Sequence, residues 1–424
     1  MCSLFLNWNH FGVSINKASL GILTLSGGVD LYDAIVVGAG PIGSFLAYRL
    51  ADLGHKVAIF ERRPGVGDAV CCTGIIGKEC FERFPVAKTA ILAEASSAKF
   101  FAPSGKYLRL SKETVQAYVV DRAAFDRALF QKAREAGADC FLSSRVEDIS
   151  QQANRVMVAV EFTGKASSFE GKIAIISAGF GASLPQKLGL GKISDFVLGA
   201  QVEVTVERFE EVEVYFGQGI APGFFAWLVP TSPGKALAGL LSRRSPGLYL
   251  KNLLSSLLSR RKIISAESKI TYGGIPLKPL PKTYKERVVV VGDAAGQVKP
   301  TTGGGIYYGL LCADIAAEVI NDALGANDFS AKQLSSYEKG WKKKLYRELQ
   351  IGYWARKVYE KLSDRQIEQI FDIVQENNIH EAVLQSPNFS FDWHGDLILR
   401  ALKYNSLLKA VRSVAIRPLR SFKV

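Results

Sequence analysis

The clearest hydrophobic pattern lies near the start of the chain, where two short apolar runs flank a stretch of helical character. Residues 32–37 and 56–60 are mostly apolar, as strands covered on both faces of a parallel sheet are. Between them, residues 41–53 have the pattern of a helix that ends at Gly54. This order of elements predicts a βαβ unit with parallel strands.

Beyond this unit the pattern alternates between strands and helices before it becomes wholly helical. From residue 197 to 275, alternating strands and turns indicate an antiparallel sheet. Beyond residue 326 the composition is helical and basic, with no strand signal. The other predicted elements are a helix at 121–137 with Asp121 as its N-cap, strands at 153–162, 172–177 and 287–291, and a helix at 305–324.

The composition is that of a folded protein with an excess of basic residues. The chain has 424 residues, of which 48% are hydrophobic and 22% charged, and this length predicts two or three domains. The net charge of +13 favours an anionic partner such as nucleic acid, phospholipid headgroups or a phosphorylated substrate. No apolar run reaches the roughly 18 residues of a membrane-spanning helix.

The cysteines do not indicate a metal site. They lie at positions 2, 71, 72, 80, 140 and 312 and form no C-x-x-C pair. This spacing disfavours zinc ribbons, dithiol redox motifs and ferredoxin-type clusters. We therefore expect no metal, and a cytoplasmic location suits this cysteine usage better than secretion.

A phosphate-binding glycine pattern lies at the turn between the first strand and its helix. In Gly38-x-Gly40-x-x-Gly43, the glycines allow a tight turn, the approach of a pyrophosphate to the backbone, and close packing of helix on strand. The start of the helix adds partial positive charge. Glu61 ends the second strand, 18 residues after the last glycine, where it can accept hydrogen bonds from an adenosine ribose. These residues predict a dinucleotide site in a Rossmann-type domain.

A second strand–turn–helix junction lies at residues 288–306. Its apolar strand leads to Gly292-Asp293, and Pro300 precedes a run of three glycines at 303–305. An acid at this turn can hold a sugar or ribityl hydroxyl, and free amides at the helix start can face a phosphate or the electron-rich edge of a flavin. By itself, the segment is equally consistent with a strand–turn–helix junction that binds no cofactor.

Together the two motifs resemble the FAD-binding fold of the glutathione reductase and p-hydroxybenzoate hydroxylase group. In that group the first glycine motif binds ADP and a distant Gly-Asp motif binds the ribityl chain, a role that the resemblance gives to Asp293. Asp121-Arg122 matches an Asp-Arg pair that lies near the flavin in that group. The group's third motif, an Asp-Gly after the central strand, is degenerate here, and residues 178–183 stand in its place.

Finer features resemble the geranylgeranyl reductase family within this group. Residues 67–75, which include Cys71 and Cys72, look like the cysteine-bearing segment of that family. Residues 222–230 are similar to its P-x-x-Y-x-W-x-F-P motif, with Phe225 in place of the Tyr and Val229 in place of the Phe. The resemblance runs from about residue 32 to 324. The two substitutions bear on the substrate pocket and not on the flavin site.

The resemblance implies an α/β fold with three parts. These are a Rossmann-type FAD-binding domain, an inserted antiparallel-sheet substrate domain and a helical C-terminal region. We expect the FAD-binding domain at 31–84, 108–195 and 276–325, the substrate domain at 85–107 and 196–275, and the helical region at 326–424. Residues 1–29 contain one lysine and no acid, and we expect residues 1–30 to be a disordered leader or an over-long gene start.

The motifs and the resemblance also assign roles to single residues. The expected FAD-binding residues are Gly38, Gly40, Gly43, Glu61, Arg62, Cys72, Arg122, Gly292, Asp293, Pro300, Gly303, Gly304, Gly305 and Ile306. Cys72 and Trp227 are expected to be catalytic, and Phe225, Trp227 and Pro230 to bind the prenyl chain. Without the resemblance, Cys72 is better explained as a small buried hydrophobe, and Phe225 and Trp227 are equally well explained as core residues of a strand.

The family implies FAD-dependent reduction of geranylgeranyl or other isoprenoid double bonds by hydride transfer from reduced flavin. An unactivated alkene has no carbonyl to polarise, so protonation creates partial cationic character that the face of Trp227 can stabilise. The expected substrate is a prenylated lipid, a prenyl diphosphate, or a prenylated quinone or pigment. Because the sequence has one Rossmann glycine motif, the electron donor, NAD(P)H or a ferredoxin, is expected to be external.

Two other functions stay open at this point. A flavin monooxygenase or halogenase is one, because residues 225–230 nearly match the halogenase motif W-x-W-x-I-P, although the first Trp is missing. A flavoprotein that passes electrons to a membrane quinone is the other. Known members of that type append an iron–sulfur domain, whereas no cysteine follows Cys312 here.

Basic residues gather near the end of the chain. Residues 396–424 contain seven Lys or Arg and one acid, a charge of +6. The apolar residues that follow helical spacing are Leu397, Ala401, Tyr404, Leu408, Val411 and Ala415. The segment is either a helix that packs on the protein or an interfacial segment at the anionic inner face of the membrane. Nucleic acid is not expected, because no nucleic-acid-binding module accompanies the charge.

Overall fold

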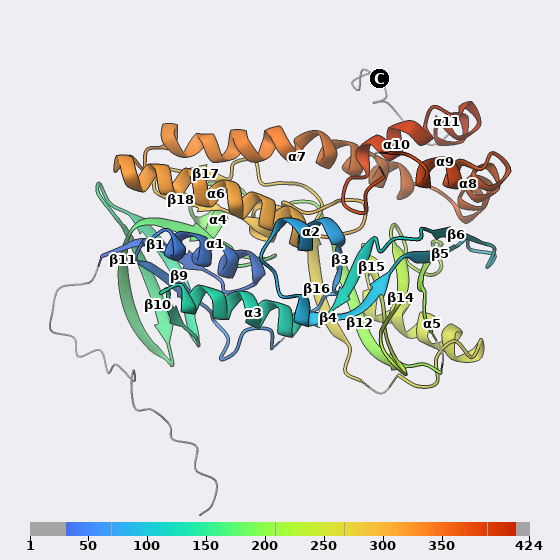
Figure 1. Ribbon diagram of the computed structural model, residues 1–424, viewed down its shortest axis with the longest axis horizontal. Coiled ribbons are helices and arrows are strands. Elements are labelled where there is room, and N and C mark those ends of the chain that lie inside the picture. The colour runs from blue at the N-terminus through green and yellow to red at the C-terminus, as the bar shows by residue number, and fades with distance from the viewer. Residues whose placement is uncertain (1–30, 69, 208, 267, 388, 413–424) are drawn as a thin grey trace, which may run out of the picture. The chain divides into compact units, whose positions relative to one another are not determined.

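The computed structural model describes residues 31–68, 70–207, 209–266, 268–387 and 389–412 (Figure 1). The leader that we expected at residues 1–30 lies outside these ranges, as does the end of the basic tail.

The first sheet contains the βαβ unit. Its path runs through β17 (Tyr284–Lys285), β18 (Val288–Val290), β11 (Lys165–Ile176), β1 (Leu31–Val37), β2 (Val57–Phe60) and β8 (Asp139–Phe141). The strands β10 (Val156–Phe162) and β9 (Ser144–Gln151) continue from β11 as antiparallel neighbours. Strand β1 pairs in parallel with β2 and β11, and β11 with β18. The carboxyl ends of these strands therefore meet at one edge, where ligands of such sheets bind.

Alternating residues of β1 pack into the two hydrophobic cores that lie on opposite faces of this sheet. Ala34 and Val36 face the helices, and Ile35 and Val37 face the opposite core, which includes Val158 of β10. The helices on the first face are α1 (Pro41–Asp52), α3 (Arg122–Glu135) and α6 (Ile306–Ala326) (Figure 1). The predicted N-cap of α3 is confirmed, because the Asp121 carboxylate accepts a hydrogen bond from the Ala124 amide at 3.0 Å.

The second sheet is mainly antiparallel, as predicted. Its strands follow in the order β16 (Thr271–Pro276), β12 (Phe196–Thr205), β15 (Lys235–Ser242), β14 (Phe225–Ser232), β13 (Val212–Phe216), β5 (Ser97–Phe101) and β6 (Tyr107–Ser111). Two features were not predicted. Strand β5 joins β13 in parallel, and α5 (Pro246–Ser259) covers one face through Leu250, Leu253 and Leu257. A smaller sheet contains β3 (Ile75–Gly77), β7 (Ala117–Val120) and β4 (Ile91–Ala95).

The chain after residue 326 is helical, as predicted. The long helix α7 (Ala331–Tyr359) packs on α6 through Tyr337, Trp341 and Leu345, and leads toward the second sheet (Figure 1). The helices α8 (Asp364–Glu376), α9 (Ile379–Leu384), α10 (Gly395–Ala401) and α11 (Asn405–Arg412) follow it. Ile398 and Leu407 pack in one cluster with α7, so the described part of the basic segment packs on the protein.

Short elements complete the described chain. They are α2 (Lys78–Arg83), α4 (Leu184–Lys187), and the 3-10 turns at Lys88–Ala90 and Gly292–Ala295. The predicted α/β architecture, with parallel and antiparallel sheets and C-terminal helices, is confirmed. The division into domains at the stated boundaries stays a prediction. Of the helices in the described ranges, none combines the length and apolar character needed to cross a membrane.

Candidate functional site

A cavity of about 1010 Å³ brings residues of both large sheets together. The residues predicted for FAD binding that line it are Gly38, Gly40, Glu61, Arg62, Cys72, Arg122, Gly292, Asp293, Gly303, Gly304, Gly305 and Ile306. Phe225 and Trp227, predicted to contact substrate, line it as well. Sequence segments separated by more than 200 residues therefore share one space.

The first glycine motif has a different steric constraint at each position. Gly38 has φ +100°, and a Cβ there would lie 2.8 Å from the carbonyl oxygen of Ser177. A Cβ on Gly43 would overlap the carbonyl oxygen of Gly38, so a glycine at this position is needed for the close approach of α1 to the strand. Gly43 does not line the cavity. A Cβ on Gly40 would meet no atom within 4 Å. Gly40 therefore leaves open space beside the backbone at the cavity wall.

Glu61 is oriented by backbone donors at the end of β2. Its Oε2 accepts a hydrogen bond from the Ala39 amide at 3.1 Å, and its Oε1 accepts one from the Arg63 amide at 3.0 Å. The carboxylate thus joins the glycine turn to the second strand. Each oxygen keeps a lone pair for a further donor, such as a ribose hydroxyl.

Asp293 lies on the opposite wall, in the 3-10 turn that follows β18. No hydrogen bond reaches its carboxylate from the residues that the structure describes, and burial raises its pKa to about 6, although Arg122 opposes the shift. A Cβ on Gly305 would lie 2.6 Å from Asp293 Oδ1, so the glycine run lets α6 begin close to this acid. A mostly buried acceptor without a donor fits a ligand hydroxyl.

Two helices begin at the cavity without a capping side chain. The N-cap residues are Gly40 for α1 and Gly305 for α6, and neither helix has a side-chain cap or an acid in its first turn. Their free amides and partial positive charge therefore face the cavity. Together with Glu61 and Asp293, these helix starts fit the phosphates, ribose and ribityl chain of FAD.

Cys72 and Arg122 lie together between the cofactor motifs and the second sheet. Arg122 lies beside Cys72 and pairs with Asp126, with Nη2 at 2.9 Å from Oδ1. Gln201 of β12 donates to the Cys72 carbonyl oxygen at 3.3 Å. Cys71 differs, because burial raises its pKa and it packs beside Gly273 of β16. Of the two cysteines, Cys72 is the one that lies beside a cation.

The aromatic residues of β14 form part of the wall on the second sheet. Phe225 and Trp227 face the cavity on alternate positions, with ring centroids 6.1 Å apart. A Cβ on Gly239 of β15 would lie 2.6 Å from the Trp227 ring, so this glycine makes room for the indole. Val214 and Phe216 of β13 extend the apolar wall.

Pro230 and Pro300 do not line the cavity. Pro230 lies on the opposite face of β14 from Phe225 and Trp227, since side chains alternate along a strand. It pairs with Ala236 of β15. Its contact with substrate stays a prediction. Pro300 is buried beside α7, where it lies near Gly352.

Several lining residues were missed by the sequence analysis. Lys299 is 5% exposed, lines the cavity, and its Nζ lies 2.6 Å from Asp392 Oδ1. Arg356 and Tyr359 line the cavity from the end of α7. Arg356 and Tyr359 belong to the region after residue 326, and Lys299 pairs with Asp392 of that region. The sequence there shows amphipathic helices and no motif.

Metal binding finds no support in the geometry of the described ranges. No group of three or more His, Cys, Asp or Glu side chains there could hold a metal ion, and the five cysteines in these ranges are free thiols.

Comparisons with known proteins connect this site to a family. A family model described as lycopene cyclase protein matches residues 33–380. The digeranylgeranylglycerophospholipid reductase of Methanocaldococcus jannaschii is 32% identical over 360 residues, which cover 82% of this chain and 92% of that protein.

Solved structures agree with this relationship. A geranylgeranyl bacteriochlorophyll reductase-like protein from Thermoplasma acidophilum superposes with a TM-score of 0.80 at 25% identity, covering 92% of this chain and all of its own. A p-nitrophenol 4-monooxygenase from Pseudomonas putida has a TM-score of 0.66 at 16% identity, over 89% of this chain and 98% of its own, and shares the fold alone. The chain matches the lycopene cyclase family model over most of its length and belongs to the geranylgeranyl reductase family of FAD-dependent oxidoreductases.

Proposed function

We propose that this protein reduces carbon–carbon double bonds of geranylgeranyl or related isoprenoid chains with FAD as its cofactor. One observation carries the proposal: the two cofactor motifs and the aromatic wall of β14 line a single cavity. When bound and reduced, FAD supplies the hydride for such a reaction. Gly38, Gly40, Glu61 and Asp293 are the residues that would hold it.

The chain's own residues supply the surroundings of the alkene. Phe225 and Trp227 line the cavity, and an aromatic face stabilises positive charge that develops on carbon. The apolar wall excludes water from that charge. We assign Cys72, which lines the cavity beside Arg122 and the cofactor motifs, as the group that exchanges a proton with the alkene.

The substrate that best fits this wall is a prenylated lipid. The relative from Methanocaldococcus jannaschii is named for a digeranylgeranylglycerophospholipid, which carries prenyl chains on a phosphorylated headgroup. Prenyl diphosphates and prenylated quinones or pigments have the same chain. The donor that reduces the flavin is NAD(P)H or a ferredoxin from outside the chain, since the sequence has one Rossmann glycine motif.

The protein acts at the anionic face of a membrane, where such substrates reside. The excess of basic residues supports this location, because Lys and Arg near an anionic surface are attracted to it. Residues 413–424 add Arg417, Arg420 and Lys423 to the charge of the C-terminal region.

The function is tested by asking what oxidises the reduced, FAD-loaded protein. The protein is reduced by dithionite without oxygen and mixed with geranylgeranyl diphosphate, with a prenylated quinone, or with oxygen and an aromatic compound. We expect the absorbance of oxidised flavin to return with the prenyl alkene. Its return only with oxygen would indicate a monooxygenase or halogenase, and its return only through the quinone ring would indicate an electron carrier. Either result would refute the proposal.

A further inference from the structure

A buried arginine lies beside the aromatic wall of the cavity. Arg356 is in the last turn of α7, is 4% exposed, and lines the cavity with Tyr359 and Phe225. Gly352, one turn earlier, is close to Pro300 and Thr301. These two residues belong to the segment 296–305 that leads from Asp293 to α6, here called the cofactor loop. Arg356 therefore lies one helical turn beyond that loop, on the side of the second sheet.

The guanidinium of Arg356 is stacked on aromatic rings, and no residue of the described ranges forms a hydrogen bond with it. Its Cζ lies 3.5 Å from the ring centroid of Phe224 and 5.2 Å from that of Tyr359. Its Nε and Nη2 are buried and form no hydrogen bond within the described part of the chain. The carboxylate recorded nearest to it is Glu360, whose Oε1 is 3.6 Å from Nε.

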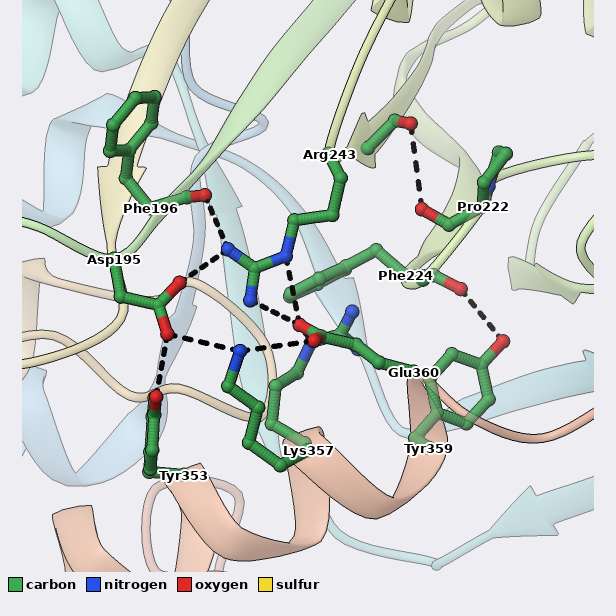
Figure 2. Close-up of polar contacts among 12 residues, drawn as sticks. Asp195, Phe196, Pro222, Phe224, Arg243, Tyr353, Lys357, Tyr359 and Glu360 are labelled. Carbon is green, nitrogen blue, oxygen red and sulfur yellow. Dashed lines mark hydrogen bonds and ion pairs between the residues drawn. The ribbon is translucent and has the colours of Figure 1, made fainter.

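Glu360 is already shared by other cations. It accepts a hydrogen bond from Arg243 Nε at 2.9 Å and pairs with Lys357 Nζ at 3.2 Å (Figure 2). The second acid, Asp195, is bound by Arg243, by Lys357 at 3.1 Å, and by the Tyr353 hydroxyl at 2.6 Å (Figure 2).

The charges of this cluster do not balance. Arg243, Lys357 and Arg356 are three cations, and Asp195 and Glu360 are two carboxylates. Arg243 and Lys357 are partly exposed, whereas the Arg356 side chain is 3% exposed. The surplus positive charge is therefore located at the member that water reaches least.

A buried cation without hydrogen-bond partners is costly, and here burial lowers the pKa of Arg356 to about 9, against the attraction of Glu360. Ring stacking uses the flat faces of a guanidinium and leaves its N–H donors free in the plane. This is the geometry in which arginine binds phosphate through a fork of donors.

The wall next to Arg356 is apolar. Phe216 is near Tyr359, with ring centroids 5.8 Å apart, and the lining continues along β13 through Val214 to Val212. At strand spacing this strip is roughly 13 Å long. A ligand that fits both features has an anionic head and an apolar chain.

We propose that Arg356 binds the phosphate group of a phosphorylated prenyl substrate, with the prenyl chain lying along the apolar strip of β13 and β14. This inference rests on the proposed function and narrows its substrate to phosphate-bearing prenyl compounds. A prenyl diphosphate and a prenyl glycerophosphate both carry that group.

The test measures equilibrium binding to the oxidised, FAD-loaded protein by calorimetry. The ligands are geranylgeranyl diphosphate, a digeranylgeranylglyceryl phosphate and the uncharged geranylgeraniol. The quantity compared is the ratio of the affinity for each phosphate ligand to that for geranylgeraniol. In Arg356→Gln we expect this ratio to fall roughly 10- to 150-fold, the range for loss of hydrogen bonds to a charged group. If the affinity ratio falls for only one of the two phosphate ligands, that ligand shows whether Arg356 binds a prenyl diphosphate or a prenyl glycerophosphate.

The matched control is Lys361→Gln, which removes one positive charge from an exposed position five residues away, outside the cavity wall and outside the cluster of Arg243, Lys357, Asp195 and Glu360. Its ratio should stay within a few-fold of the wild-type value. Arg356→Lys keeps the charge without the planar fork and should recover only part of the ratio. An equal fall in Lys361→Gln, or an unchanged ratio in Arg356→Gln, would overturn the proposal.

Wild-type protein provides a second measurement that does not depend on the folding of a variant. Inorganic pyrophosphate should compete with geranylgeranyl diphosphate more strongly than with geranylgeraniol. Equal effects on both ligands would contradict an anion site at Arg356. Since no measurement here involves flavin reduction, a protein that binds phosphate ligands through Arg356 but is not reoxidised by prenyl compounds would refute only the proposed function.

Discussion

At the scale of residues, Cys72 is the side chain whose chemistry the proposed reaction depends on most. Its side chain lies beside the mostly buried guanidinium of Arg122, whereas Cys71 packs against Gly273. The pair of adjacent cysteines therefore offers a test with an internal control.

We expect Cys72→Ser to bind FAD normally and to be reduced normally by dithionite, but to transfer hydrogen to prenyl alkenes at least tenfold more slowly. A serine hydroxyl keeps the approximate size of the thiol but is a far weaker acid. The measurement is the single-turnover rate of flavin reoxidation by a geranylgeranyl substrate. Cys71→Ser should keep the wild-type rate. If both variants match wild type, Cys72 is a packing residue.

Sequence motifs located the cofactor residues because each of these residues satisfies a local requirement. Gly38 needs a positive φ, and Gly43 must let the helix approach Gly38. Arg356 could not be found in this way. Its significance comes from Phe224 and from the surplus charge around Glu360, which only the folded chain brings together.

At the scale of elements, two glycines at the start of α1 are expected to have different roles: Gly40 in FAD binding and Gly43 in folding. A side chain at Gly40 points into open space at the cavity, whereas one at Gly43 meets the backbone of the preceding strand turn. A larger side chain at Gly40 should therefore impair FAD binding and leave folding intact, whereas one at Gly43 should destabilise the fold.

We expect Gly40→Val to fold with the wild-type melting temperature of the apoprotein but to purify without yellow colour. Gly43→Val should lose roughly 1–3 kcal/mol of stability or more, because it overpacks a helix against a strand. Thermal unfolding and the flavin absorbance of the two purified variants measure these effects. A folded Gly40→Val protein with full flavin content would remove the glycine turn from the FAD site.

The strands and helices that sequence analysis placed well are those with strong periodicity and local caps. Asp121 caps α3 as expected, and the apolar run before Gly292 forms β18. Helix α5 was missed because its leucines are interspersed in a region of alternating strands. The parallel pairing of β5 with β13 was missed because it joins segments more than 100 residues apart, and no local pattern encodes such a partner.

At the scale of the whole molecule, the C-terminal helices complete the cavity. Asp392 holds Lys299 of the cofactor loop, and His394 Nδ1 lies 2.7 Å from the Thr301 hydroxyl. Sequence analysis predicted a helical region here but not its contact with the cofactor loop, since that contact depends on the direction in which α7 crosses the molecule (Figure 1).

The packing of α10 and α11 determines how membrane binding should be tested. Removing all of residues 396–424 would delete Ile398 and Leu407 from their cluster. Removing residues 413–424 deletes only Arg417, Arg420 and Lys423 among the basic residues. At about 1 kcal/mol for each, binding to anionic liposomes at low salt should weaken roughly 100-fold, with flavin content unchanged.

Co-sedimentation with anionic and neutral liposomes measures this effect. The control replaces Arg417, Arg420 and Lys423 by glutamine in the full-length chain and should behave like the truncation. Full-length protein that does not sediment with anionic liposomes at low salt would contradict a location at the membrane.

The central claim, that a prenyl alkene is reduced in the cavity that holds the flavin, is tested most directly by the product of one turnover. Protein with its FAD fully reduced is mixed without oxygen with excess geranylgeranyl diphosphate, and the lipid is analysed by mass spectrometry. The account predicts one prenyl molecule with two added hydrogen atoms for each flavin reoxidised. Reoxidation of the flavin with no change in the mass of the prenyl compound would contradict it.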